Sequence, residues 1–198
     1  MRAFPFFGEP TSKTLLTNVT DRLIRTRRLS RSRSRQRSSA TSPNRNPHDL
    51  ADPGDHVIAI DGGKWEITDT APVVFKRTEL TAPMPNPEIG GDLHRLWDFI
   101  NVAEPDQPIV LAFMVAALIQ PDVPHTILAF IAEHGSAKST ATKRVVSLTD
   151  PSVVPLRMPP RDIDTWITGA NGSWVVALDN LSHISDWLSD ALCRAARR

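Results

Sequence analysis

The stretch from Ala132 to Thr140, Ala-Glu-His-Gly-Ser-Ala-Lys-Ser-Thr, constrains the fold of this chain more than any other segment. It directly follows the apolar run Thr126–Ile131, which predicts a buried strand, and it leads into a predicted helix over 138–148. The stretch approximates the pattern Gly, four residues, Gly, Lys, then Ser or Thr, with alanine at both glycine positions. A strand, a loop and a helix in this order favour an α/β fold.

Such a loop is suited to binding phosphate. Backbone N–H groups at a helix N-terminus converge on one place, and the helix dipole favours an anion there. In this arrangement Lys138 contributes a cation to the β- and γ-phosphates of ATP, and the Ser139 hydroxyl binds Mg²⁺. The predicted nucleotide contacts are Ala132, Glu133, His134, Gly135, Ser136, Ala137, Lys138, Ser139 and Thr140.

A carboxylate is expected to complete the site from a second strand. Trp174–Leu178 is a continuous apolar run of the kind found inside parallel sheets, and Asp179 follows it. Because ligands of open α/β sheets bind at the carboxyl ends of the strands, Asp179 is predicted to hold Mg²⁺ through water. Each feature alone has an ordinary explanation, since strand–turn–helix units are common and Asp179 alone would serve as a turn former or cap. Together they favour nucleotide binding.

Further segments extend the likeness to a known family: Ser147–Ser152, Pro155–Arg157, Pro160–Asp162, Trp174–His183 and Trp187–Cys193. With the loop, they resemble P-loop ATPases of bacterial and prophage origin, which are similar to primase-associated helicase ATPases. The resemblance runs from about Trp65 to Cys193 and is most specific from Ile131 onward. It implies a P-loop core with a parallel sheet and flanking helices, ATP and Mg²⁺ as cofactors, and a role on DNA in the replication of a mobile element.

The resemblance places Lys138, Asp179 and Asn180 at catalytic positions. Many related ATPases have glutamate where Asn180 stands, and an amide positions water but is a poor proton acceptor. A sensor residue and an arginine finger usually lie farther along than this chain extends. We therefore expect a C-terminally incomplete domain that binds Mg-ATP without efficient hydrolysis, so ATPase or helicase activity stays open. A homo-oligomer is expected only of a longer version.

The N-terminal quarter differs sharply in charge from the rest. Residues 1–50 hold eleven of the 23 lysines and arginines but three of the 22 acidic residues. The run Arg22–Arg37 alternates arginine with polar residues, which predicts disorder, with a short helix around Leu15–Ile24. It either binds DNA phosphates in a salt-sensitive manner or is a solvated tail. The alternative function is therefore a non-catalytic nucleic-acid-binding or remnant protein that acts through this arm.

These patterns divide the chain into a disordered basic arm (1–54), a small β-rich segment (55–82) and a P-loop NTPase domain (83–198). Strands are expected in the middle part at His56–Ile60, Lys64–Thr68 and Val73–Arg77. Helices are expected in the last part at Asp92–Val102 with Asp92 as its cap, at 106–119 buried on all sides, at Arg161–Thr168 and at Ile184–Arg197.

The remaining observations narrow the function classes. Cys193 is the single cysteine, which excludes an intrachain disulfide and fits a reducing cytoplasm. The longest apolar run, 109–119, is too short to cross a bilayer, and no signal peptide is evident. His134 and His183 are expected near the phosphates as hydrogen-bonding residues rather than metal ligands. A serine hydrolase is disfavoured because no Gly-x-Ser-x-Gly turn is present.

Overall fold

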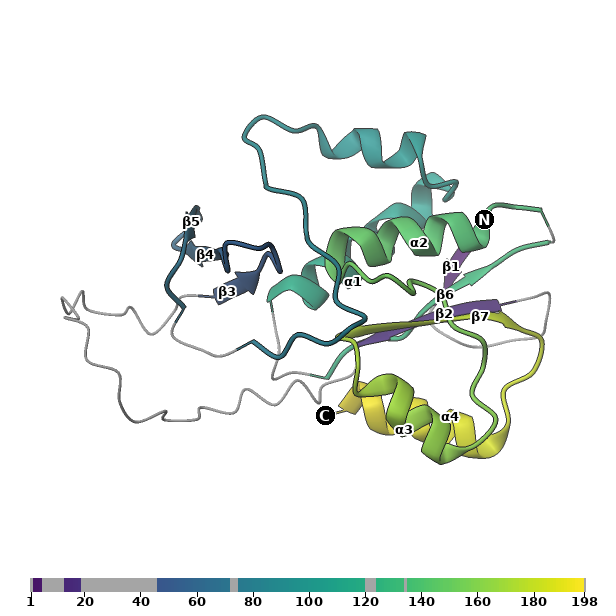
Figure 1. Ribbon diagram of the computed structural model, residues 1–198. Helices are drawn as coiled ribbons and strands as arrows, with labels where there is room; N and C mark the ends of the chain where they lie inside the picture. Colours follow the sequence, from purple (N-terminus) through teal and green to yellow (C-terminus); the bar gives the residue numbers. More distant parts are fainter. Residues whose placement is uncertain are drawn as a thin grey trace.

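The computed structural model describes residues 2–4, 13–18, 46–71, 75–119, 124–133 and 135–197. The Arg22–Arg37 run and His134 lie outside the described residues, so the expectations for them are not addressed by the fold. The described chain is mixed α/β, with two sheets and helices on both faces of the larger one (Figure 1).

The larger sheet brings together the two ends of the chain. Its strand order is β1 (Arg2–Phe4), β6 (Leu128–Ile131), β2 (Lys13–Asn18) and β7 (Val175–Leu181). Strand β2 is antiparallel to both β6 and β7, so those two strands run in the same direction on either side of it. The two strands are not neighbours, however, and every pairing between the named strands of this sheet is antiparallel, so the described residues do not form the expected parallel sheet.

Strand β2 corrects the sequence interpretation of the N-terminal arm. Residues 15–18 were expected to begin a short helix, and they lie instead in a strand. The segment Lys-Thr-Leu-Leu-Thr-Asn carries no strong helical period, and pairing with two long-range neighbours decides its conformation. Residues 2–4 and 46–49 also form strands within the range expected to be disordered.

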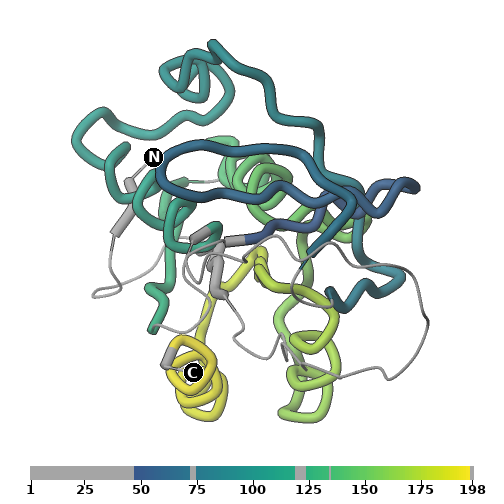
Figure 2. Tube along the Cα trace, turned by 90° about the vertical axis from the view of Figure 1, so that its left-hand side faces the viewer, coloured from purple at the N-terminus to yellow at the C-terminus, as the bar shows by residue number. Residues whose placement is uncertain are grey.

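Helices pack two hydrophobic cores against the larger sheet. Helices α1 (Gln107–Ile119) and α2 (Lys138–Thr149) cover one face, where Phe113, Phe130 and Val145 are among the buried residues. Helices α3 (Ile163–Ala170) and α4 (Asp186–Arg197) cover the other, with Trp166 and Leu178 in its core. Figures 1 and 2 show the two helix pairs on opposite sides of the strands.

Two helix expectations need correction. Helix α1 is not buried on all sides, because Val115 is 52% exposed whereas Val110 is fully buried. The helix expected at Asp92–Val102 is a 3-10 helix, η1 (Leu93–Asp98), whose cap is as expected: the Asp92 carboxylate accepts a hydrogen bond from the His94 backbone N–H at 2.9 Å. A second 3-10 helix, η2 (Glu104–Asp106), leads directly into α1.

The smaller sheet confirms the predicted hairpin. Strands β4 (Val57–Asp61) and β5 (Lys64–Thr68) pair across Gly62 and Gly63, whose φ values of 56° and 77° suit a tight hairpin turn that favours glycine. The third strand is β3 (Asn46–Asp49), so the sheet begins before the expected boundary at residue 55. Of the strand expected at Val73–Arg77, residues 73 and 74 are not described and 75–77 are not in a strand.

Ion pairs fix the loop beside this sheet. The Arg77 guanidinium binds both carboxylate oxygens of Asp49, at 2.8 and 2.6 Å, and one oxygen of Asp55 at 2.6 Å. The His56 ring lies 2.6 Å from the Asp52 carboxylate. A hydrogen bond with Asp52 raises the pKa of His56, and the same bond lowers the pKa of Asp52.

Candidate nucleotide-binding site

The loop between β6 and α2 surrounds the side chain of Lys138, the lysine that follows it. The Lys138 side chain is 7% exposed. Its Nζ atom donates to the backbone oxygens of Ala132 at 2.8 Å and Glu133 at 2.6 Å, and to Ser136 Oγ at 3.3 Å. An ammonium group has three donors, so all three are directed at oxygens of this loop. The cation is thus held inside the curve of the loop, at the start of α2.

The two alanines at the expected glycine positions differ in conformation. Ala137 has φ 63° and ψ 23°, which is the left-handed region, and it is the N-cap of α2. A side chain in that region costs about 1–2 kcal/mol relative to the right-handed one. Ala132 is not among the residues with positive φ, whereas Gly135 has φ 80°. The backbone conformation of the loop therefore favours glycine at position 137 but does not require glycine at position 132.

A hydrogen bond joins the start of α2, directly after the loop, to strand β7. Ser139 Oγ, in the first turn of α2, donates a hydrogen bond of 2.7 Å to Asp179 Oδ2, near the end of β7. The sequence predicted that these two residues lie at the same edge of the sheet. They do so because β6 and β7 run in the same direction, which places the end of β7 beside the start of the helix that follows β6.

An irregularity in β7 sets the position of Asp179. Leu15 pairs with Leu178 and Lys13 pairs with Leu181, so β7 carries one more residue than β2 between these two pairs. This is a β-bulge at Asp179 and Asn180, and such bulges often re-aim a side chain beside a site. Asn180 has φ 58°, and its backbone N–H donates to Asp179 Oδ1 at 2.9 Å. Asparagine tolerates this conformation better than most residues.

Arg157 supports the outer edge of β7, a role that sequence analysis missed. Its backbone N–H donates to Ala177 O and its backbone oxygen accepts from Asp179 N–H, both at 2.9 Å. The guanidinium donates to Gly169 O and to Ser173 Oγ. Burial lowers the pKa of Arg157, and nearby Asp150 partly opposes this shift. The resemblance included Arg157, but no local pattern in the sequence indicated that it anchors the strand carrying Asp179.

Several of the other predicted site residues are exposed. Asn180 and Thr140 are exposed, and no interaction of His183 with the loop is recorded among the described residues. Within the described part of the chain, no group of three or more His, Cys, Asp or Glu side chains is placed to hold a metal ion. The Mg²⁺ site expected at Ser139 and Asp179 thus offers one hydroxyl and one carboxylate, which suits an ion that keeps several of its waters.

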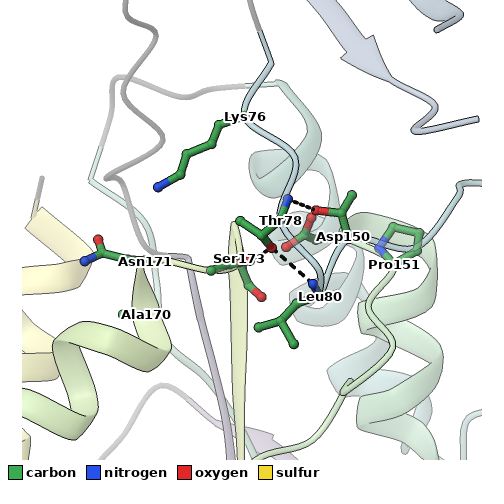
Figure 3. Close-up of a pocket in the computed structure, with 10 residues that line it drawn as sticks. Lys76, Thr78, Leu80, Asp150, Pro151, Ala170, Asn171 and Ser173 are labelled. Carbon is green, nitrogen blue, oxygen red and sulfur yellow. Dashed lines mark hydrogen bonds between the residues drawn. The ribbon is translucent and has the colours of Figure 1, made fainter.

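A small pocket lies at the opposite end of β7 from Asp179, where the segment after the small sheet meets the larger sheet (Figure 3). Its volume of about 20 Å³ suits one or two water molecules. Thr78 Oγ1 donates to Gly172 O at 3.0 Å, and the Asp150 carboxylate accepts from the backbone N–H groups of Trp174 and Val175 at 2.6 and 2.9 Å. The bond of Thr78 fastens the segment after the small sheet to the turn before β7, and the two bonds of Asp150 fasten the end of α2 to the start of β7.

The fold and the loop together define a mixed α/β protein with a lysine-bearing loop at a helix start, opposed by a carboxylate at the end of a strand. Residues 92–197, more than half of the chain, match the family model of the actinomycete integrative conjugative element replication protein. The chain belongs to this family. Comparisons with curated proteins and with solved structures each find no match.

The family match bears on the sequence-based interpretation in one respect. It supports the expected context of DNA replication in a mobile element. It does not address the predicted nucleotide site. Separately, no helix in the described ranges is long and apolar enough to cross a membrane.

Proposed function

We propose that this chain is a Mg-ATP-binding domain that acts in the replication of an integrative element. The observation that carries the proposal is the hydrogen bond of 2.7 Å between Ser139 and Asp179. A serine that follows a lysine at a helix start, and an acidic residue that follows a buried strand, are the two protein groups that a Mg-triphosphate site requires. Residues 40 positions apart in sequence meet at this point.

The loop supplies the phosphate contacts. Lys138 is pre-positioned by Ala132 O and Glu133 O, and its longest bond, 3.3 Å to Ser136 Oγ, is the one most easily exchanged for a phosphate oxygen. The left-handed conformation of Ala137 turns the backbone into α2, whose first N–H groups have no partner within the helix. These donors and the helix dipole favour a multiply charged anion.

Ser139 and Asp179 are the residues that would hold Mg²⁺, the serine directly and the carboxylate through a water molecule. Bound there, the ion would neutralise part of the phosphate charge. Asp179 keeps its orientation through the bond from Asn180 N–H to Oδ1. The Asn180 side chain cannot act as a general base at neutral pH, so the proposal is for binding and slow turnover at most.

The test uses the full chain and a fluorescent ATP analogue, titrated with and without Mg²⁺. Lys138→Ala should weaken binding at least tenfold, because a charge-assisted hydrogen bond is worth about 1.5–3 kcal/mol. Lys143→Ala is the matched control, since Lys143 is an exposed lysine one turn further along the same helix. Equal affinities for the two variants and the parent chain would overturn the proposal.

A further pair of variants tests the metal contacts. Ser139→Ala and Asp179→Asn should reduce the gain in affinity that Mg²⁺ provides and leave the Mg-free affinity close to that of the parent chain. If both variants respond to Mg²⁺ as the parent does, these residues do not bind the ion.

A DNA contact is the second part of the proposal, favoured by the match to a replication-protein family. The Arg22–Arg37 run is its candidate, since cationic residues at this density bind phosphate backbones irrespective of sequence. Replacing its arginines with glutamine in the full chain should weaken DNA binding and flatten its dependence on salt. Unchanged retention on DNA would show that the contact lies elsewhere.

A further inference from the structure

The outer edge of the small sheet is a strand that is exposed along most of its length. Strand β5 pairs with β4 on one side, and no strand in the described ranges pairs with its other side (Figure 1). Trp65 and Ile67 lie two positions apart, and therefore on one face, and are 40% and 42% exposed. An open strand edge presents unpaired backbone groups that can pair with another chain. β5 therefore offers both the backbone groups and the apolar side chains that a further strand would contact.

The hairpin turn determines which backbone groups of β5 face outward. The two glycines of the turn both have positive φ, as in a type I′ turn. The residues that flank this turn, Asp61 and Lys64, then form a hydrogen-bonded pair, and such pairs alternate along an antiparallel ladder. Every second residue from Lys64 onward thus bonds to β4. The backbone N–H and C=O groups of Trp65 and Ile67 point to the open edge.

We propose that β5 pairs antiparallel with β5 of a second copy of this chain, with Trp65 on the two-fold axis. In this register the two Trp65 residues exchange a pair of backbone hydrogen bonds, and Lys64 lies opposite Glu66 of the partner subunit. Because the axis repeats every contact, two such lysine–glutamate pairs form. Both fall at non-hydrogen-bonded positions, where directly opposite side chains lie closest together.

Charge selects this register over its neighbours. A register centred on Lys64 or on Glu66 places two like charges directly opposite each other, which is destabilising. A register centred on Ile67 places Glu66 opposite Thr68 and forms no ion pair. Of these four registers, the one centred on Trp65 alone combines outward backbone groups, an aromatic pair and opposite charges. The five residues of β5 are thus complementary to themselves.

The rival explanation is that Lys64 and Glu66 are solvated and keep the edge unpaired, since charged residues on a short edge strand are a common protection. Strand β5 precedes residues 92–197, which match the family model, and it belongs to the other sheet from the proposed nucleotide site. The dimer therefore stands or falls without regard to nucleotide binding. An interface of this small size predicts weak association that depends on concentration.

The experiment is sedimentation equilibrium of the full chain, freed of nucleic acid, at micromolar and higher concentrations. We expect the parent chain to dimerise. Lys64→Glu and Glu66→Lys should each weaken dimerisation about tenfold or more, because each turns two attractive pairs into two repulsive ones. Mixed in equal amounts, the two variants should associate as readily as the parent chain, because all facing charges are then opposite. Lys143→Glu, which reverses an exposed lysine on α2, is the matched control and should dimerise as the parent does.

A double variant guards against a loss of folding. Lys64 also lies opposite Asp61 within the hairpin, so urea midpoints report any loss of stability that its reversal causes by itself. Lys64→Glu combined with Glu66→Lys keeps opposite charges in this register and should dimerise as the parent chain does. A parent chain that stays monomeric overturns the proposal, and so does a dimer that neither single reversal weakens. If neither the mixture nor the double variant restores association, charge pairing across the axis plays no part and the proposal is likewise overturned.

Discussion

Replacing Ala137 with glycine should stabilise the protein. Ala137 occupies the left-handed region at φ 63° and ψ 23°, where its methyl group costs about 1–2 kcal/mol. Glycine removes this cost but adds about 0.5–1 kcal/mol of backbone entropy to the unfolded chain. Glycine is also a better N-cap than alanine, which adds a few tenths of a kcal/mol at most to the gain. The expected net stabilisation is about 0.5–1 kcal/mol.

The measurement is urea unfolding of the full chain, followed by tryptophan fluorescence. Ala132→Gly is the matched control, since Ala132 is in the same loop but lacks a positive φ. It should be destabilised by about 0.5–1 kcal/mol, because it gains only the entropy of the unfolded state. Gly135→Ala should also lose stability, since Gly135 has φ 80°. Destabilisation by both alanine-to-glycine changes would refute the conformation assigned to Ala137.

Three further predictions concern residues outside the proposed phosphate contacts. Asn180→Gly should leave stability and Mg-dependent ATP binding nearly unchanged, whereas Asn180→Val, strained at φ 58°, should cost about 1–2 kcal/mol in urea unfolding; equal behaviour would argue against the bulge. Asp150→Ala should destabilise by about 2–4 kcal/mol because two buried backbone N–H groups lose their acceptor, while Asp150→Asn, which retains an oxygen, should cost less. The Asp52–His56 pair should stabilise most where both are charged, above the lowered pKa of Asp52 and below the raised pKa of His56. The contribution of this pair to the free energy of unfolding is fully present below the ordinary histidine pKa of about 6.5, and it is lost as pH rises through the raised pKa of His56. The difference in the free energy of unfolding between the parent chain and His56→Gln should therefore be smaller at pH 8.5 than at pH 6.

The sequence predicted those parts of the fold that local patterns determine. The hairpin around Gly62 and Gly63 was predictable because two β-rich runs flank a glycine pair. Helix α2 and the meeting of Ser139 with Asp179 followed from a strand–loop–helix order and a second apolar strand. For the hairpin and for α2, a short stretch of chain contains the physical cause of the structure, whereas the contact between Ser139 and Asp179 also depends on the shared direction of β6 and β7.

Other features depend on partners that are distant in sequence. Strand β2 has no distinctive local period, and it takes its conformation from two neighbours that lie much further along the sequence. The bulge at Asn180 was missed because an extra residue in a strand shows only when its register against another strand is known. An asparagine after a buried strand was the available signal, since it tolerates a positive φ.

The placement of β2 also governs the order of assembly. A ribosome produces this strand long before its two neighbours, β6 and β7, which lie much further along the sequence. Until they are made, β2 has neither partner. Once made, β6 and β7 expose unpaired backbone edges that can join other chains until β2 pairs with them. Because such distant pairings close late and slowly, folding of the larger sheet should be rate-limited by capture of its N-terminal strand. The proposed nucleotide site would then be among the last of the described parts to form.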